Sequence, residues 1–116
     1  MDWSFPPEAE EFRNEVKAFI AEHLTDDVIN STHDGTIHNW DFHKKIAERG
    51  WLGGAVPADL GGGGKSALEM AVMIEELQLA GAPIDGMGVA IVVASVVLEL
   101  GNDHLKEAIV PKLLSG

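Results

Sequence analysis

The chain has 116 residues, no cysteine, and a formal net charge of −11 from 19 acidic and 8 basic residues. A charge of this sign and size repels phosphate backbones and anionic lipid headgroups, so nucleic acids and membrane surfaces are excluded as expected partners. The length suits one domain with a sizeable core, and the lack of cysteine excludes disulfides and thiolate metal sites.

The first residues show no sign of a secretory signal. Residues 1–8 contain neither a basic segment nor an apolar one, and a signal peptide needs both. Together with the absence of cysteine, this pattern fits a reducing compartment, so we expect a cytoplasmic protein.

The first predicted helix begins near Pro7, which suits the first helical position because its missing N–H has no partner there in any case. Glu8, Glu10 and Glu11 favour the positive end of the helix dipole. The apolar residues that follow are spaced to share one helix face. They are Phe12, Val16, Phe19, Ile20 and Leu24.

A second helix is predicted at 39–49, after a polar segment at 26–37 that is typical of a loop. Within this helix, Trp40, Ile46 and Ala47 are the residues expected to reach the core. The helix ends before Gly50, which can take the left-handed conformation that closes a helix.

A glycine-rich segment follows, in which Trp51 and Leu52 supply the apolar contact that accompanies a helix stop. The four glycines at 61–64 resemble phosphate-binding loops only loosely. A P-loop needs a glycine where this chain has Asp59, and the dinucleotide-like spacing Gly62-x-Gly64-x-x-Ala67 has no βαβ pattern around it. We expect these glycines to serve tight turns and close backbone approach.

A third helix is predicted from Ser66 to Ala80. The Ser66 hydroxyl is placed to cap it, and Glu69, three residues on, completes a capping box. Gly81 and Pro83 end the helix, because neither residue favours its continuation.

A fourth helix is predicted at about 88–100, ended by Gly101, and a fifth begins at Asn102 or Asp103. The fourth segment is rich in β-branched residues, so a strand is the alternative. Its length favours a helix, since it exceeds most buried strands and falls short of the ~20 apolar residues of a membrane span.

The third and fourth helices are apolar over most of their circumference. The polar residues of the third are Glu69, Glu75, Glu76 and Gln78, and no charge occurs at 86–98. A domain of about five helices can place one such helix at its centre. We therefore expect the other to face outward, either as an exposed apolar patch or against a further domain or subunit.

Two clusters of polar residues were candidates for chemistry. Glu75 and Glu76 are adjacent, and adjacent helical residues point about 100° apart. We expect one to be solvated and the other to pair with a cation, not to act together on a substrate. His33, His38 and His43 lack the converging spacing of metal ligands and are expected to be surface histidines.

Several short groups of residues occur in a fixed order along the chain. They are Gly50-Trp51-Leu52-Gly53, Val56-Pro57-Ala58-Asp59-Leu60-Gly61-Gly62, Glu75-Glu76-Leu77, Leu100-Gly101-Asn102, Pro111-Lys112-Leu113 and Ser115-Gly116. This order resembles the N-terminal helical domain of the acyl-CoA dehydrogenases, flavoenzymes that desaturate acyl-CoA thioesters between the α and β carbons. The resemblance implies an all-α, up-and-down bundle of about five helices over residues 1–116.

The resemblance also implies what surrounds this domain. A flavin-binding β-domain and a C-terminal helical domain with the catalytic glutamate would lie outside this chain, so no residue here is expected to be catalytic and the chain alone is expected to be inactive. The enzyme would be an oxidoreductase of fatty acid and lipid metabolism. FAD would be bound mainly by the other parts, as would the phosphates of CoA, which fits the acidity of this chain.

Partners are implied in the same way: an acyl-CoA substrate, an electron-accepting flavoprotein, and further domains or subunits in a homo- or hetero-oligomer. The alternative from a different class is a stand-alone helical module that binds a protein through the apolar faces of helices 66–80 and 88–100, without redox activity. The sequence does not indicate the length, branching or steroid character of an acyl group.

Finally, the resemblance implies an acyl pocket beside the start and first half of the fourth helix. The residues it places near the pocket wall are Asp85, Gly86, Val89, Ala90 and Val93. Two of them, Gly86 and Ala90, are small and four positions apart, which leaves a groove along one helix face. Small residues at this spacing also allow close helix packing, so pocket lining and packing both remain open.

Overall fold

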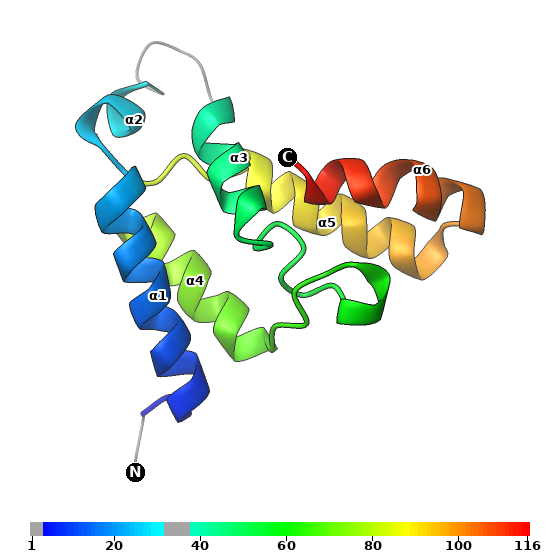
Figure 1. The fold of residues 1–116 in the computed structure, drawn as a ribbon, viewed down its shortest axis with the longest axis horizontal. Coiled ribbons are helices and arrows are strands. Elements are labelled where there is room, and N and C mark those ends of the chain that lie inside the picture. The colour runs from blue at the N-terminus through cyan, green and yellow to red at the C-terminus, as the bar shows by residue number, and fades with distance from the viewer. Residues whose placement is uncertain (1–3, 32–37) are drawn as a thin grey trace.

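The computed structural model describes residues 4–31 and 38–116, and every regular element in these ranges is helical. The elements are α1 (Pro7–His23), α2 (Asp26–Asn30), α3 (Trp40–Glu48), the 3-10 helix η1 (Ala58–Leu60), α4 (Ala67–Leu79), α5 (Asp85–Leu100) and α6 (Asp103–Leu114). Figure 1 shows two helix pairs, α1 with α4 and α5 with α6, with α3 at their junction. The predicted all-α fold is confirmed.

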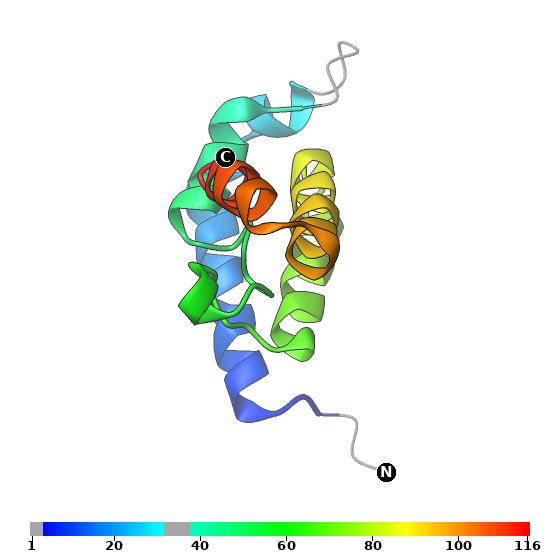
Figure 2. The ribbon, with the colours of Figure 1, turned by 90° about the vertical axis from the view of Figure 1, so that its right-hand side faces the viewer.

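The helices form two layers. Viewed from the side, α1, α3 and α6 lie in one layer and α4 and α5 in the other (Figure 2). The principal extents of 44 × 40 × 21 Å agree with this, since 21 Å is about the thickness of two packed helices. The accessible surface of 7137 Å² exceeds the ~6,100 Å² typical of a compact monomer of this mass.

The main core lies between α1 and α4. Phe12, Val16 and Phe19 follow one face of α1 and are buried, as their spacing predicts. The α4 residues in the same cluster are Met70, Val72, Met73 and Leu77. Because burial of each such side chain contributes about 1.5–3 kcal/mol, this contact is the largest apolar contribution to holding the layers together.

The turn after α3 joins this core to the rest of the chain. Gly50 has φ 74°, and its N–H donates to Ala47 O at 2.8 Å, so the predicted left-handed helix stop is confirmed. Trp51 is buried directly after it. Its ring meets Phe12 and Phe19 edge-on, with centroids 5.6 and 4.9 Å apart.

Arg13 connects α1 to α4 by ion pairs with two carboxylates. Its Nη1 lies 2.7 Å from Glu75 Oε2 and also contacts Glu76 Oε1. The hydrogen bonds that Arg13 donates to Glu75 and Glu76 raise the pKa of Arg13 above its usual range. The expectation that only one glutamate pairs with a cation is therefore wrong: the guanidinium enters from the facing helix and can reach both side chains.

The segment predicted as a loop at 26–37 begins with a helix. The Thr25 side chain accepts a hydrogen bond from the Val28 N–H and starts α2, which ends at Asn30. A single capped turn has too few residues to show a helical period in the sequence. The polar residues of this segment favoured a loop instead. Residues 32–37 lie outside the described part of the chain.

Two further predictions about α3 and α5 need correction. Trp40 is 63% exposed and does not reach the core, whereas Phe42, on the opposite side of the first turn of α3, is buried with Ile46. The fourth predicted helix, α5, begins at Asp85, earlier than expected, and it is helical throughout, so the strand alternative is wrong.

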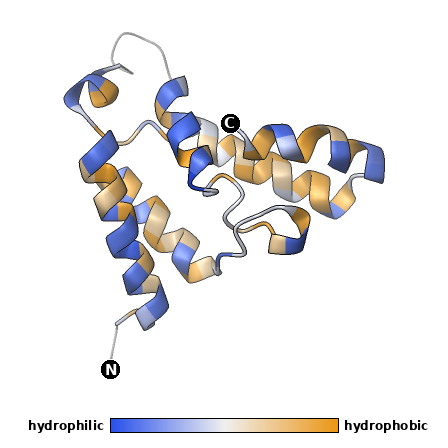
Figure 3. Ribbon diagram, viewed as in Figure 1, coloured by the Kyte–Doolittle hydropathy of each residue, from blue (hydrophilic) through white to orange (hydrophobic). Residues whose placement is uncertain are grey.

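α5 is the apolar helix that the domain leaves partly uncovered. Val89, Val92, Val96 and Leu100 lie along its exposed face, and Figure 3 shows apolar colouring over much of α5 and α6. We call these four residues the α5 stripe. The expectation that one of the two apolar helices is left uncovered is confirmed. Across residues 4–31 and 38–116, no helix has the length and apolar content needed to cross a membrane.

The N-terminus of α4 provides a test of the local energetics. The Ser66 hydroxyl accepts from the Glu69 N–H, and the Glu69 carboxylate accepts from the Ser66 N–H. We expect Ser66→Ala to lower the free energy of unfolding by about 1 kcal/mol in denaturant titrations followed by circular dichroism. The matched control is Ser95→Ala, which removes a hydroxyl bonded within an exposed turn of α5 and should change stability by less than about 0.5 kcal/mol. Equal effects of the two changes would contradict the capping role.

Candidate functional site

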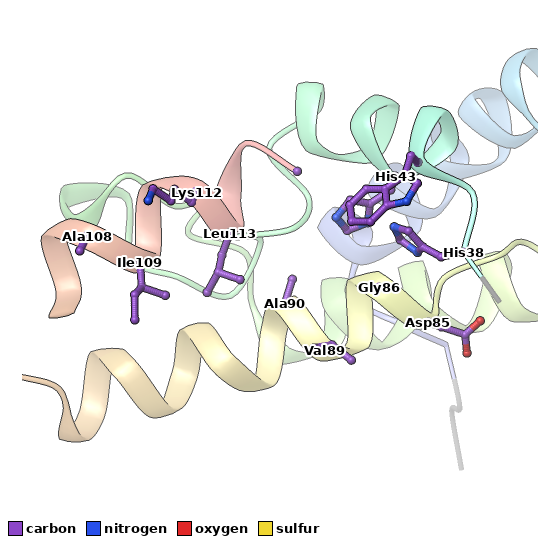
Figure 4. A pocket seen from close by; sticks show the side chains of 12 residues that line it. His38, His43, Asp85, Gly86, Val89, Ala90, Ala108, Ile109, Lys112 and Leu113 are labelled. Carbon is purple, nitrogen blue, oxygen red and sulfur yellow. The ribbon is translucent and has the colours of Figure 1, made fainter. Parts of the chain in front are cut away.

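A pocket of about 620 Å³ lies between the two layers, with α5 on one side and α3 and α6 on the other (Figure 4). Its α5 wall consists of Asp85, Gly86, Val89 and Ala90. Its α6 wall includes Ile109 and Leu113, whose apolar side chains point toward α5 in Figure 4. The volume lies within the range of small-molecule sites in proteins.

Four of the five residues predicted near a pocket wall line this pocket. Ala90 is buried and its side chain points toward α6, while the Asp85 carboxylate points away from Ala90 and Leu113 (Figure 4). Val93, the fifth residue, is half-buried and is not among the lining residues. That any of the five contacts a substrate remains a prediction.

The end of the pocket beside α3 is aromatic. The rings of His38, Trp40 and His43 meet edge-on, with centroid separations of 4.2 Å for His38–Trp40, 4.8 Å for His38–His43 and 6.0 Å for Trp40–His43. We call these three residues the aromatic cluster. The sequence alone did not indicate that these three rings lie together. The one local signal was the three-residue spacing of Trp40 and His43, which places them on one face of α3.

His43 is not the surface residue that the sequence suggested. Only 7% of it is exposed, because it lies on the inner side of α3. Desolvation, and then the charge of His38, lowers the pKa of His43 below its ordinary value. The ring is therefore neutral near pH 7, with one N–H donor and one nitrogen acceptor.

Gly86 allows the cluster to lie against α5. A Cβ atom at this position would come within 2.1 Å of His38 Cε1. The missing side chain thus makes room for the imidazole at the first turn of α5, and the groove expected from Gly86 and Ala90 holds the His38 ring at one end.

The histidines do not form a metal site with other described residues. Within residues 4–31 and 38–116, no group of three or more His, Cys, Asp or Glu side chains could hold a metal ion. His33, the third histidine of the predicted surface set, lies outside these ranges.

The glycine-rich loop does not fit the pyrophosphate of a nucleotide cofactor. The N–H groups of Gly62, Gly63 and Gly64 donate to the carbonyls of Pro57, Gly53 and Val56. A phosphate cradle needs such amides to be free. A Cβ at Gly62 would also lie 2.1 Å from Val56 O. The structural role predicted for these glycines is confirmed.

The pocket is built for binding more than for chemistry. Glu75 and Glu76 are engaged by Arg13 at the α1–α4 contact and are absent from the pocket lining. The lining offers apolar walls, two imidazoles, and the charged side chains of Asp85 and Lys112. This arrangement can hold an apolar molecule and hydrogen-bond to one end of it.

Comparison with known proteins identifies the family. The model of the acyl-CoA dehydrogenase N-terminal domain matches residues 6–116, and the chain belongs to this family. Among curated proteins, acyl-CoA dehydrogenase FadE26 of Mycobacterium tuberculosis is 27% identical over 97% of this chain. The chain spans only 30% of the length of that relative.

Solved structures agree with the fold. The Tcur3481-Tcur3483 steroid ACAD is similar to the chain with a TM-score of 0.82 and 28% identity, over 99% of this chain and 30% of that one. The ChsE4-ChsE5 complex from Mycobacterium tuberculosis is similar with a TM-score of 0.82 and 25% identity, over 99% of this chain and 29% of that one.

Two glycines of α5 test the contact between the helix and the cluster. Alanine normally stabilises a helix interior relative to glycine by about 0.5–1 kcal/mol. We expect that gain for Gly88→Ala, because a Cβ there meets nothing within 4 Å. Gly86→Ala should gain less or lose stability, because the new methyl group must displace the His38 ring. Denaturant titration measures both changes, and equal gains at the two positions would contradict the packing of His38 on Gly86.

Proposed function

We propose that the chain, as a member of this family, forms one wall of the acyl-binding pocket of an FAD-dependent acyl-CoA dehydrogenase. The observation that carries the proposal is the 620 Å³ pocket with apolar α5 and α6 walls, present in a domain that matches the family model. FAD, when bound by the rest of the enzyme, would supply hydride acceptance. In the desaturation, the acyl group would lose one proton from the α carbon and one hydride from the β carbon, and the residues of this chain would hold the acyl group in place.

The contribution of this chain would be binding and exclusion of water. Ala90 on α5 faces Ile109 and Leu113 on α6 across the pocket, and Val89 also lines the pocket. Apolar walls of this kind bury an acyl group and fix its path, which holds the reacting carbons in one place. We assign the base to the part of the enzyme outside residues 1–116, as the family resemblance implies.

A bulky fused-ring acyl group is the substrate class that we propose. One of the similar solved structures is named a steroid ACAD, and a pocket of 620 Å³ has room for a group of that size. A flexible straight chain would also enter, but it would leave much of the volume unfilled and gain less from burial.

The α5 stripe supports the proposal that other domains or subunits cover this domain. Val89 is 63% exposed and Val96, two turns further along α5, is 53% exposed, with no charged residue between them. The similar solved structures are two-component assemblies, ChsE4-ChsE5 and Tcur3481-Tcur3483. We propose an oligomeric cytoplasmic enzyme of lipid metabolism that passes electrons to an acceptor flavoprotein, with FAD and the phosphates of CoA bound mainly outside this chain.

A second candidate function rests on the same stripe. A stand-alone helical module could use the exposed face of α5 to bind a protein partner without redox activity. The two candidates differ in what the pocket is for, because only the enzyme requires the space between α5 and α6 to accept an acyl group.

A steric block at Ala90 tests the enzyme proposal. In the complete dehydrogenase, we expect Ala90→Phe to lower kcat/KM for bulky acyl-CoA substrates at least tenfold while largely sparing short ones, because the ring occupies space that only large groups reach. The measurement is a series of specificity constants across acyl groups of increasing size, with the melting temperature recorded beside it.

Ala94→Phe is the matched control for this test. Ala94 is also buried on α5 but is not among the pocket-lining residues. The larger ring should therefore crowd the core, lower the free energy of unfolding by about 1–3 kcal/mol and reduce activity on all substrates together. If Ala90→Phe lowers kcat/KM equally for all acyl groups and also lowers the melting temperature, Ala90 is a packing residue and the proposed pocket wall is wrong.

A further inference from the structure

The two ends of the pocket differ in chemistry. The space between α5 and α6 is bounded by apolar side chains such as Ala90, Ile109 and Leu113, whereas the end beside α3 presents the aromatic cluster. A purely apolar ligand would be served by apolar residues throughout. Imidazoles at one end therefore indicate a ligand with a polar group at a fixed place.

The imidazole nitrogens of the aromatic cluster make no hydrogen bonds to other described residues. In residues 4–31 and 38–116, neither His38 nor His43 makes a side-chain hydrogen bond or an ion pair. No fully buried side-chain nitrogen or oxygen in these ranges lacks a hydrogen-bond partner. The unpartnered nitrogens of His43 therefore reach open space, although the residue is only 7% exposed, and the open space beside it is the pocket.

We propose that the aromatic cluster is a subsite for an uncharged hydroxyl group, carried by the end of the acyl group farthest from the thioester. The inference rests on the proposed function, since it names a feature of the substrate that would fill the same pocket. The thioester must reach a flavin outside this chain, whereas the aromatic end of the pocket contains His43, which is buried within this domain.

A hydroxyl fits the hydrogen-bonding capacity of the two rings. A neutral imidazole has one donor and one acceptor, and a hydroxyl can donate to one ring and accept from the other. The rings of His38 and His43 are 4.8 Å apart, which is close enough for one oxygen to contact both. Trp40 presents an apolar surface beside them, suited to the ring that carries the hydroxyl.

A charged group suits this end less well. His43 is held in the neutral form, so it offers a carboxylate no full positive charge. Asp85 also lines this part of the pocket and would repel an anion. An ammonium group would have to leave water for a site where the Asp85 carboxylate points away from Ala90 and Leu113 (Figure 4), which is costly for a charged group.

The test compares two acyl-CoA thioesters with the same fused-ring acyl group, one with a hydroxyl at the end distant from the thioester and one with hydrogen there. In the complete dehydrogenase, kcat/KM should favour the hydroxylated compound, and His43→Phe should reduce that preference about tenfold, the loss expected for one hydrogen bond. His38→Phe should reduce it in the same direction. His43→Gln, which keeps a donor and an acceptor, should restore part of it.

His104→Gln is the control, because His104 is an exposed histidine on α6 outside the pocket lining. It should leave the preference and both specificity constants unchanged. An unchanged preference in folded His43→Phe and His38→Phe would overturn the subsite. If Ala90→Phe still lowers kcat/KM for bulky acyl groups more than for short ones, the proposed pocket wall is supported and only the subsite is wrong. If Ala90→Phe shows no such difference either, the proposed function itself is wrong.

Discussion

The edge-on packing of Trp51 against Phe12 and Phe19 is the contact on which the rest of the domain depends. Trp51 follows α3 immediately, so its burial requires the abrupt left-handed turn at Gly50. From there the chain passes Gly53, where a Cβ would lie 2.4 Å from Leu114 Cδ2 of α6. The same short segment thus fixes α3 to the α1–α4 core and seats the end of α6, and these two helices form one side of the pocket.

The parts of this arrangement that depend on neighbouring residues could be predicted from the sequence. The capping box at Ser66 and Glu69, the stop at Gly50 and the stripe through Phe12 and Val16 are all local patterns. Predictions failed where a distant element decides the outcome. Arg13 of α1 engages both glutamates of α4 because it approaches from across the interface, and no spacing within α4 could indicate that.

The candidate site also has one part that could be predicted from the sequence and one that could not. Four of the five residues that the resemblance implies near an acyl pocket line the pocket beside α5, and Val93 does not, while their contact with an acyl group stays a prediction. The aromatic cluster could not be found from the sequence, because His38 becomes a neighbour of Gly86 only after α3 and α5 pack in separate layers. Trp40 was expected in the core since aromatic residues are usually buried, yet its large ring lies at the pocket instead.

The central claim is that the acyl group lies in the pocket between α5 and α6. Since the chain has no cysteine, Ile109→Cys and Leu105→Cys each introduce one thiol into it, one turn apart on α6 and outside the α5 stripe, and only position 109 lines the pocket. The measurement is the rate of alkylation of that thiol by a maleimide in the complete enzyme, with and without a fused-ring acyl-CoA. We expect severalfold protection by the ligand in Ile109→Cys and none in Leu105→Cys. Equal rates with and without the ligand in Ile109→Cys would contradict the claim.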